Sequence, residues 1–351
     1  MERYIGLDVH VESTTIAVAS PSGKQLKSLV VPTSGEALFD AIASIKGRRH
    51  VCLEEGTQSE WLTDLLWPLA EELVVFVPDR RRGNKSDLSD AWKAAEGVRL
   101  NAHTTRVYKP GRELSRLRAA VRGYGMVTDD VVRTKNRIRA AYRSHGLHTP
   151  GGELFRPVAR KQWEQKLPAA LRKQVRLLGS ELDALLPLQL EAKQHLCTEA
   201  RQHPAVRWLM TAPAIKEVRA AQIVAVVGTP WRFRTKRQFW SYCGLGIVMR
   251  STANWAYTPD GRRVKVQSEQ TRGLNRKRNP LLKDVFKGAA TQVCTRMREH
   301  PLHQQYQRLV EAGTKPNLAK LTIARHIAAA TLAVWKHEED YDPERVGKEP
   351  R

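Results

Sequence analysis

Residues 85–96, KSDLSDAWKAAE, place two carboxylates three positions apart, at Asp87 and Asp90. A spacing of three projects both side chains from one face of a helix. One interpretation is helix capping, because Ser86 or Asp87 can accept a hydrogen bond from a free backbone N–H and acidic residues favour the positive end of the helix dipole. The other is a shared divalent cation, which carboxylate oxygens bind well. The pair alone does not decide between them.

Further carboxylates follow strand-like segments earlier in the chain. Asp8 ends the apolar run of YIGLDVH, and Glu54 and Glu55 end that of HVCLEEGT. Asp87 and Asp90 come after a third such run, VVFVPD. In an α/β sheet, side chains at the carboxyl ends of the strands converge on a site. Clustered carboxylates repel one another unless a cation neutralises them. The set therefore predicts a Mg²⁺ or Mn²⁺ site for phosphodiester chemistry.

Basic residues directly precede the acidic pair. Arg80, Arg81 and Arg82 form a run, and Lys85 adjoins the motif. Beside metal-bound aspartates, such cations are interpreted as contacts to backbone phosphates. In the whole chain, 59 Lys and Arg exceed 36 Asp and Glu, for a net charge of +23. This excess implies a polyanionic partner, usually nucleic acid, with an incidentally basic enzyme as the alternative.

The remaining composition argues against several classes of protein. The four cysteines are scattered without a C-x-x-C pair, which disfavours a zinc ribbon or disulfide framework and suits a reducing cytosol. The 11 histidines form no H-E-x-x-H spacing, so zinc is not expected. No apolar run approaches the roughly 20 residues of a membrane span, and the N-terminus lacks a signal-peptide pattern. We expect a soluble, cytoplasmic protein with no membrane partner.

The hydrophobic pattern divides the chain into three domains and a tail. In 1–108, three strand-like segments precede alternating helices and strands, which predicts a mixed α/β sheet of the RNase H type. In 109–204, apolar residues at helical spacing with Lys and Arg between them predict long, paired, basic helices. In 205–338 we expect a compact, mainly helical domain, interrupted by a loop or hairpin near 251–263. Residues 339–351 are expected to form a flexible tail.

The basic middle helices are a candidate nucleic-acid track, because so many charges of one sign favour a polyanionic partner over a merely solvated surface. Its candidate contacts are Arg133, Lys135 and Arg139.

Several ordered motifs resemble the IS110 family of transposases. GLDVH, LEEGT and NKSDLSDAWKAAE resemble the family's N-terminal RuvC-like DEDD domain, with its G-[IL]-D opening, E-A-T-G-like strand end and K-[TS]-D-x-x-D-A motif. In the last third, PAIKEVRAAQIVAVVG, FRTKRQFWSYCGL and GLNRKRNPLLKDVFKGAA resemble its C-terminal domain. The resemblance spans residue 3 to about 336, with the central helices matched only in character.

Carried over position by position, the resemblance implies a catalytic, metal-ligating set of Asp8, Glu55, Asp87 and Asp90. Glu55 is preferred to Glu54 because it immediately precedes Gly-Thr, where the family has its Glu before Ala-Thr. Neighbouring side chains of a strand turn to opposite faces, so only one of the two glutamates is expected to face the site.

The resemblance also implies a nucleophilic serine, which it aligns with Ser251. The family usually has Ser-Gly at this place, whereas this chain has Ser251 followed by Thr252. From the sequence alone Ser251 is an ordinary loop serine. Arg250, Arg262 and Arg263 lie nearby in the sequence and either stabilise the pentacoordinate phosphorus or are solvated loop charges.

Together these features predict a transposase or site-specific recombinase that cleaves and rejoins DNA through a Mg²⁺-assisted DEDD site and a covalent phosphoserine intermediate. The resemblance further implies a structured guide RNA and a homo-oligomer, with the serine and the DEDD residues combined in one composite site. Two alternatives stay open: a RuvC-like structure-selective nuclease that uses water, and a non-catalytic nucleic-acid-binding scaffold.

Overall fold

The computed structural model describes residues 1–77, 86–103, 105–109, 111–149 and 151–345, with the side chains of 249–256 and 265–272 left aside. The chain forms two compact units, Met1–Glu113 and Leu114–Arg351. The middle and C-terminal helices fall within one of these units. The division into three domains and a tail stays a prediction.

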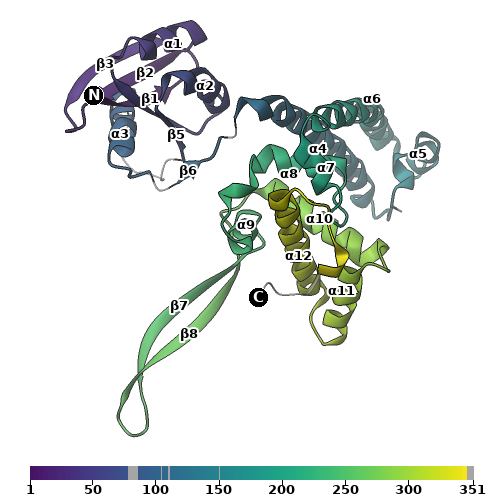
Figure 1. Ribbon diagram of the computed structural model, residues 1–351. Helices are drawn as coiled ribbons and strands as arrows, with labels where there is room; N and C mark the ends of the chain where they lie inside the picture. The colour runs from purple at the N-terminus through teal and green to yellow at the C-terminus, as the bar shows by residue number, and fades with distance from the viewer. Residues whose placement is uncertain (78–85, 104, 110, 150, 346–351) are drawn as a thin grey trace. The chain divides into compact units, whose positions relative to one another are not determined.

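The N-terminal unit is built on a six-stranded mixed sheet with the strand order β3-β2-β1-β4-β5-β6 (Figure 1). Strands β1, β4 and β5 are parallel to one another, whereas β2, β3 and β6 each run antiparallel to their neighbours. The strands are β1 (Glu2–Val9), β2 (Ser13–Ala19), β3 (Gln25–Pro32), β4 (Arg48–Glu54), β5 (Glu72–Phe76) and β6 (Arg106–Val107).

Helices cover both faces of this sheet. On one face, α1 (Gly35–Ala43) and α2 (Ser59–Leu66) pack Leu38 and Leu62 against a layer of buried strand residues. On the other face lies α3 (Asp87–Arg99), whose Ala94 and Val98 pack against Cys52 and Phe76. This arrangement confirms the predicted mixed α/β fold. The short edge strand β6 was not predicted, because two residues carry no readable alternation.

Helix α3 approaches strand β1 unusually closely at Gly6. A Cβ atom at this position would lie 2.0 Å from the carbonyl oxygen of Ala91 and 2.4 Å from the amide nitrogen of Ala95. Both are backbone atoms that cannot rotate away, so only glycine permits this packing. The contact fixes the distance between β1 and the first turn of α3.

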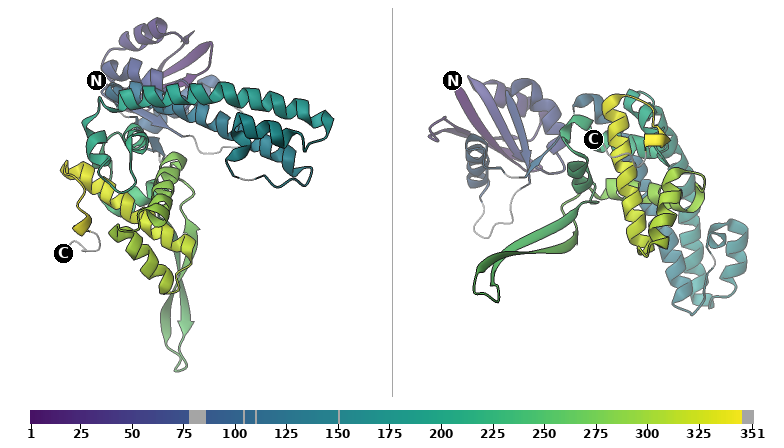
Figure 2. Two further views of the ribbon diagram at one scale, coloured as in Figure 1. Left: turned by 90° about the vertical axis from the view of Figure 1, so that its right-hand side faces the viewer. Right: turned by 60° about the horizontal axis from the view of Figure 1, so that its bottom comes forward.

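The C-terminal unit begins with two long helices that run antiparallel and side by side (Figures 1 and 2), α4 (Ser115–Arg143) and α6 (Ala169–Ala200). The C-terminal half of α4 and the N-terminal half of α6 form a small core with Leu154 and Leu167. Their other ends contribute Leu117 and Leu196 to the larger core of the following helices. The other helices are α5 (Pro157–Glu164), α7 (Pro204–Leu209), α8 (Glu217–Val227), α9 (Lys236–Tyr242), α10 (Pro280–Arg296), α11 (Pro301–Glu311) and α12 (Pro316–His337).

A long β-hairpin interrupts these helices. Its strands, β7 (Ile247–Tyr257) and β8 (Arg263–Leu274), pair antiparallel and form a two-stranded sheet of their own. The hairpin projects from the helices of this unit (Figure 1). It is longer than the sequence suggested, since strand pairing extends on both sides of 251–263.

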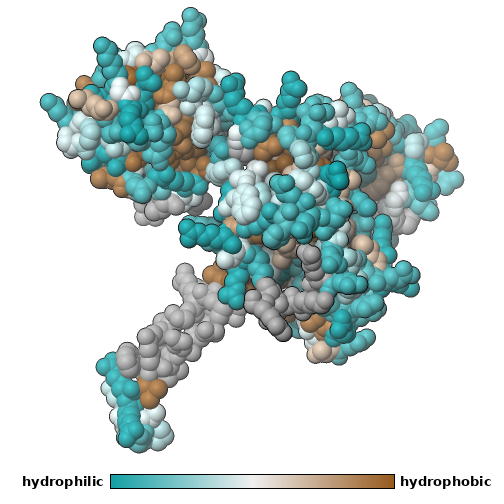
Figure 3. Space-filling model, in the orientation of Figure 1, coloured by the Kyte–Doolittle hydropathy of each residue, from teal (hydrophilic) through white to brown (hydrophobic). Residues whose placement is uncertain are grey.

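Hydrophilic residues cover most of the face shown in Figure 3, and apolar residues are scattered among them. Within the described ranges, no helix has the length and apolar character needed to cross a bilayer. The prediction for a tail at 339–351 lies partly outside the described residues and stays a prediction.

We expect Gly6→Ala to lower the free energy of unfolding of the N-terminal unit by about 2 kcal/mol or more, because the added methyl group overpacks the contact with α3. Gly125→Ala in α4 is the matched control, since a Cβ atom there meets no atom within 4 Å and alanine favours a helix by about 1 kcal/mol. Urea unfolding followed by circular dichroism measures both. Equal stability of the Gly6→Ala and native proteins would contradict the close contact.

Candidate active site

The carboxyl end of β1 carries two potential ligands, Asp8 and His10. Residues two apart in a strand point to the same face, so Asp8 follows Gly6 on the face that α3 covers. The Asp8 side chain is only 18% exposed. His10 lies just beyond the end of the strand, and its Nε2 atom is 3.3 Å from Oδ2 of Asp8.

The first turn of α3 supplies the next carboxylate. Ser86 caps this helix, because its hydroxyl accepts a hydrogen bond from the backbone N–H of Ser89 at 3.3 Å. Asp87 is therefore not needed as the cap, and its Oδ1 atom lies 3.4 Å from Nε2 of His10. One ligand atom from each of Asp8, His10 and Asp87 can be chosen so that all three lie within 4.8 Å of one another.

Asp90 lies one turn further along α3. Its carboxylate accepts a hydrogen bond from Nζ of Lys93 at 2.8 Å. Burial raises the pKa of Asp8, and the negative charges of Asp87 and Asp90 raise it further, whereas His10 lowers it. The three aspartates are thus close enough to repel one another, and this repulsion favours binding of a cation.

These groups fit a divalent metal ion. Two carboxylates and an imidazole converge at the end of a strand, and the neighbouring aspartate adds negative charge. Carboxylate oxygens suit Mg²⁺ and Mn²⁺. His10 was not predicted from the sequence, because it belongs to no zinc-type spacing such as H-E-x-x-H. The D-x-H pattern at the end of a strand, which places both side chains on one face, is the signal that could have indicated it.

The two candidate glutamates differ in their surroundings. Strands β1 and β4 are parallel with Leu7 opposite Leu53, so alternation places Glu54 on the same face of the sheet as Asp8. Glu54 and Glu55 both line a cleft of about 240 Å³ that Asp8 and His10 also line.

Glu55 is already held by cationic and polar neighbours. Nζ of Lys109 lies 2.9 Å from its Oε1 and 2.7 Å from its Oε2. The hydroxyl of Ser59 donates to Oε2 at 3.1 Å, and Lys109 also donates to that hydroxyl at 2.9 Å. Glu55 therefore has an ion-paired environment.

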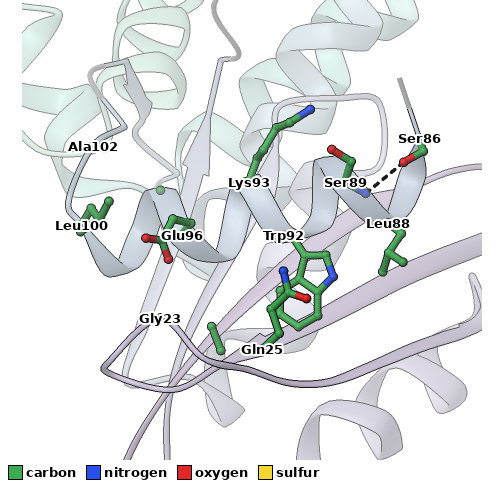
Figure 4. A pocket seen from close by; sticks show the side chains of 12 residues that line it. Gly23, Gln25, Ser86, Leu88, Ser89, Trp92, Lys93, Glu96, Leu100 and Ala102 are labelled. Atoms are coloured by element: carbon green, nitrogen blue, oxygen red, sulfur yellow. Dashed lines mark hydrogen bonds between the residues drawn. The ribbon is translucent and has the colours of Figure 1, made fainter. Parts of the chain in front are cut away.

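A larger cavity of about 740 Å³ lies on the outer side of α3, between that helix and the turn joining β2 and β3 (Figure 4). Trp92 and Gln25 face each other within it, and Leu88 lies at one end. None of the candidate carboxylates lines it. Size therefore does not identify the site, since it is the smaller cleft that Asp8, His10, Glu54 and Glu55 line.

The predicted nucleic-acid contacts of the N-terminal unit, Arg80, Arg81, Arg82 and Lys85, lie outside the described residues. In the helical unit, Arg133 pairs with Asp130 at 2.5 Å. Lys135 and Arg139 lie over the ring of Phe155, at 5.4 and 4.8 Å from its centroid.

The predicted nucleophile lies in the hairpin. The backbone of Ser251 is within β7, opposite Glu269, and Thr252 is opposite Ser268. Ser251 is thus in a strand and not in a loop. The side chains of Arg250, Ser251 and Thr252 lie outside the described part. Arg262 and Arg263 follow the hairpin turn, and Nε of Arg262 is 3.5 Å from Oδ2 of Asp260.

Two models of transposase families match the chain. A model of the IS110 DEDD type, described as a transposase, matches residues 5–145. A second model, described as the transposase IS116/IS110/IS902 family, matches residues 206–307. The first match includes all the candidate carboxylates, and the second includes Ser251. No curated protein matches the chain.

Millimolar Mn²⁺ should raise the unfolding temperature of the native protein, because a ligand that binds only the folded state stabilises it, by about 1.4 kcal/mol at ten times its Kd. Asp8→Asn or Asp87→Asn should remove more than half of this shift. Asp40→Asn, at an exposed position of α1, is the control and should keep the full shift. An unchanged shift in the Asp8 and Asp87 variants would place the bound ion elsewhere.

Proposed function

The chain belongs to the IS110 family of transposases, and we infer that it cleaves and rejoins DNA strands through a divalent-metal site at its acidic cluster and a covalent phosphoserine intermediate. The observation that carries this proposal is the convergence of Asp8, His10 and Asp87 at the end of β1. Membership supports the DEDD chemistry and the DNA substrate.

Asp8 and Asp87 would hold Mg²⁺ or Mn²⁺, with His10 as a further ligand and Asp90 beside them. When bound, such an ion neutralises negative charge that develops at the phosphorus centre and polarises the attacking oxygen. The protein's own part is to hold these side chains in place, which the β1–α3 contact at Gly6 does. Lys93, paired with Asp90, limits the surplus negative charge.

We assign the fourth carboxylate to Glu54, with the sequence-based choice of Glu55 as the alternative. Glu54 shares the sheet face of Asp8 and α3, as the register of β1 and β4 requires. Glu55 is engaged by Lys109 and Ser59, and recruiting it to a metal would break that pair. Its role would be to fix the segment after β4 against the start of α2.

Ser251 is the proposed nucleophile. Its oxygen would attack phosphorus, so that a serine–phosphorus ester forms as the bond to the departing strand end breaks. The serine gives up its proton, and the departing oxygen takes one up. Because one ester bond replaces another, rejoining needs no ATP. Arg250, Arg262 and Arg263 lie near Ser251 in the sequence. Their positive charges make them candidates for contacts to the reacting phosphate.

Ser251 and the carboxylates lie in different units of the chain. We propose that the protein acts as a homo-oligomer and that the serine and the carboxylates act on the same DNA. The net charge of +23 supports a nucleic-acid partner, and we propose DNA and a structured guide RNA, with the cytoplasm as the location. Arg133, Lys135 and Arg139 on α4, with Arg80, Arg81, Arg82 and Lys85, are the proposed phosphate contacts.

Glu54→Gln should lower Mg²⁺-dependent cleavage of labelled DNA by at least about 100-fold, since losing even an outer-shell partner of a metal costs about 10–100-fold. Glu55→Gln, an equal change one residue away, should keep most of the activity. Both should bind DNA as the native protein does, because the basic surface is unchanged. The reverse ranking would restore Glu55 as the fourth carboxylate.

Ser251→Ala should abolish a denaturant-resistant protein–DNA adduct and all recombination, because the attacking oxygen is gone. Thr252→Ala should keep both. Incubation with labelled DNA and Mg²⁺, followed by denaturing electrophoresis, measures the adduct. If the adduct is lost only in Thr252→Ala, Thr252 and not Ser251 is the nucleophile. Strand cleavage that survives both changes favours a hydrolytic nuclease, and native protein that binds but never cleaves favours a scaffold.

A further inference from the structure

The positive charge of the chain is concentrated in one segment. Residues 131–180 contain twelve Lys and Arg but only two acidic residues, which gives ten of the chain's net +23 charges. This segment forms the second half of α4, the short helix α5 and the beginning of α6. These elements share the small core that contains Tyr142 and Val175.

A cleft of about 630 Å³ lies between α5 and α6 in this region. Its lining includes four cations, Arg160, Lys161, Arg172 and Arg176, and two carboxylates, Glu164 and Asp183. The charges that line it therefore leave an excess of two positive charges. The family comparisons and the sequence motifs assign nothing to this cleft.

Three of these cations are arginines held by hydrogen bonds to the protein. Arg160 is buried, and its Nη2 atom donates to Asp183 at 2.5 Å. Gly179 makes room for it, since a Cβ atom there would lie 2.5 Å from Nη1 of Arg160. Arg172 donates to the carbonyl oxygens of Leu167 and Gln165 at 2.9 and 3.1 Å.

Arg176 is held in the same way, because its Nε atom donates to Glu164 at 2.5 Å. A guanidinium group has five N–H donors, so each of these arginines keeps donors beyond the bonds named here. Holding the groups in place reduces the side-chain entropy that a ligand must otherwise remove. Lys161 is exposed on α5 and adds a further positive charge to the lining of the cleft.

We propose that the α5–α6 cleft binds backbone phosphates of a nucleic acid. Arginine forks match phosphate oxygens, and the excess positive charge together with the surrounding basic segment favours a polyanion over an isolated small anion. Both DNA and RNA supply this phosphodiester chemistry. The inference rests on the proposed function only in that the partner is a nucleic acid. It adds a binding site on the helical unit that is separate from the residues assigned to strand cleavage.

The test measures binding of the full-length protein to a labelled DNA duplex and to a labelled RNA hairpin at several salt concentrations. Each phosphate contact contributes about 0.9 to the slope of log K against log salt on duplex DNA. Lys161→Gln combined with Arg176→Gln should reduce this slope by about 1 to 2 on the probe that occupies the cleft. Both residues are exposed, so the fold should be retained, and circular dichroism checks this.

Lys24→Gln combined with Lys27→Gln is the control, because it removes the same charge from exposed positions of the other unit. Its slope should match that of the native protein on both probes. An unchanged slope in the cleft variant, or an equal reduction in the control, overturns the proposal. The two proposals can fail separately. If the salt slopes change as expected but the native protein forms no serine adduct, the cleft proposal is supported and the phosphoserine mechanism is refuted.

Discussion

The close packing of α3 on β1 at Gly6 is the contact on which the acidic cluster depends. Any side chain at position 6 would push the backbone of α3 away from the strand. Asp8 follows on the same face, so the contact that brings the helix near also brings Asp87 and Asp90 near Asp8. Burial raises the pKa of Asp8, and repulsion from Asp87 and Asp90 raises it further, so holding these carboxylates together is a cost that the packing of the unit must offset. A cation bound among these carboxylates would relieve the repulsion between them.

Parts of this site follow from short-range rules and could be predicted from the sequence. Asp8 ends an apolar strand, and Asp87 and Asp90 begin a helix, so their positions at one edge of a sheet follow from the order of elements. The choice between Glu54 and Glu55 does not, because it depends on the register with β1 and on Lys109, which is 54 residues away from Glu55. The D-x-H spacing from Asp8 is local and could have indicated His10, whereas the approach of Asp87 to His10 depends on the packing of α3 on β1.

The charge pattern shows a similar limit. Composition indicated a polyanionic partner, and helical spacing indicated long basic helices, both from local information. The helical spacing did not indicate α5, because its eight residues are too few for a clear periodicity. Nor could it separate cations that hold the fold from cations available to a ligand. Arg160 is buried against Asp183, whereas Lys161, the next residue, is exposed. Only the packing distinguishes these neighbours.

The hairpin that carries Ser251 is held in place less firmly than the acidic cluster. In the described ranges, β7 and β8 pair only with each other, and an isolated two-stranded hairpin is marginally stable in water. Strand pairing fixes the position of Ser251 along the hairpin but not the position of the hairpin itself. The carboxylates are held by a packed sheet and helix, whereas the serine would be held by what the hairpin contacts. On the proposed mechanism, binding of the nucleic acid would have to hold the hairpin in place before Ser251 could react.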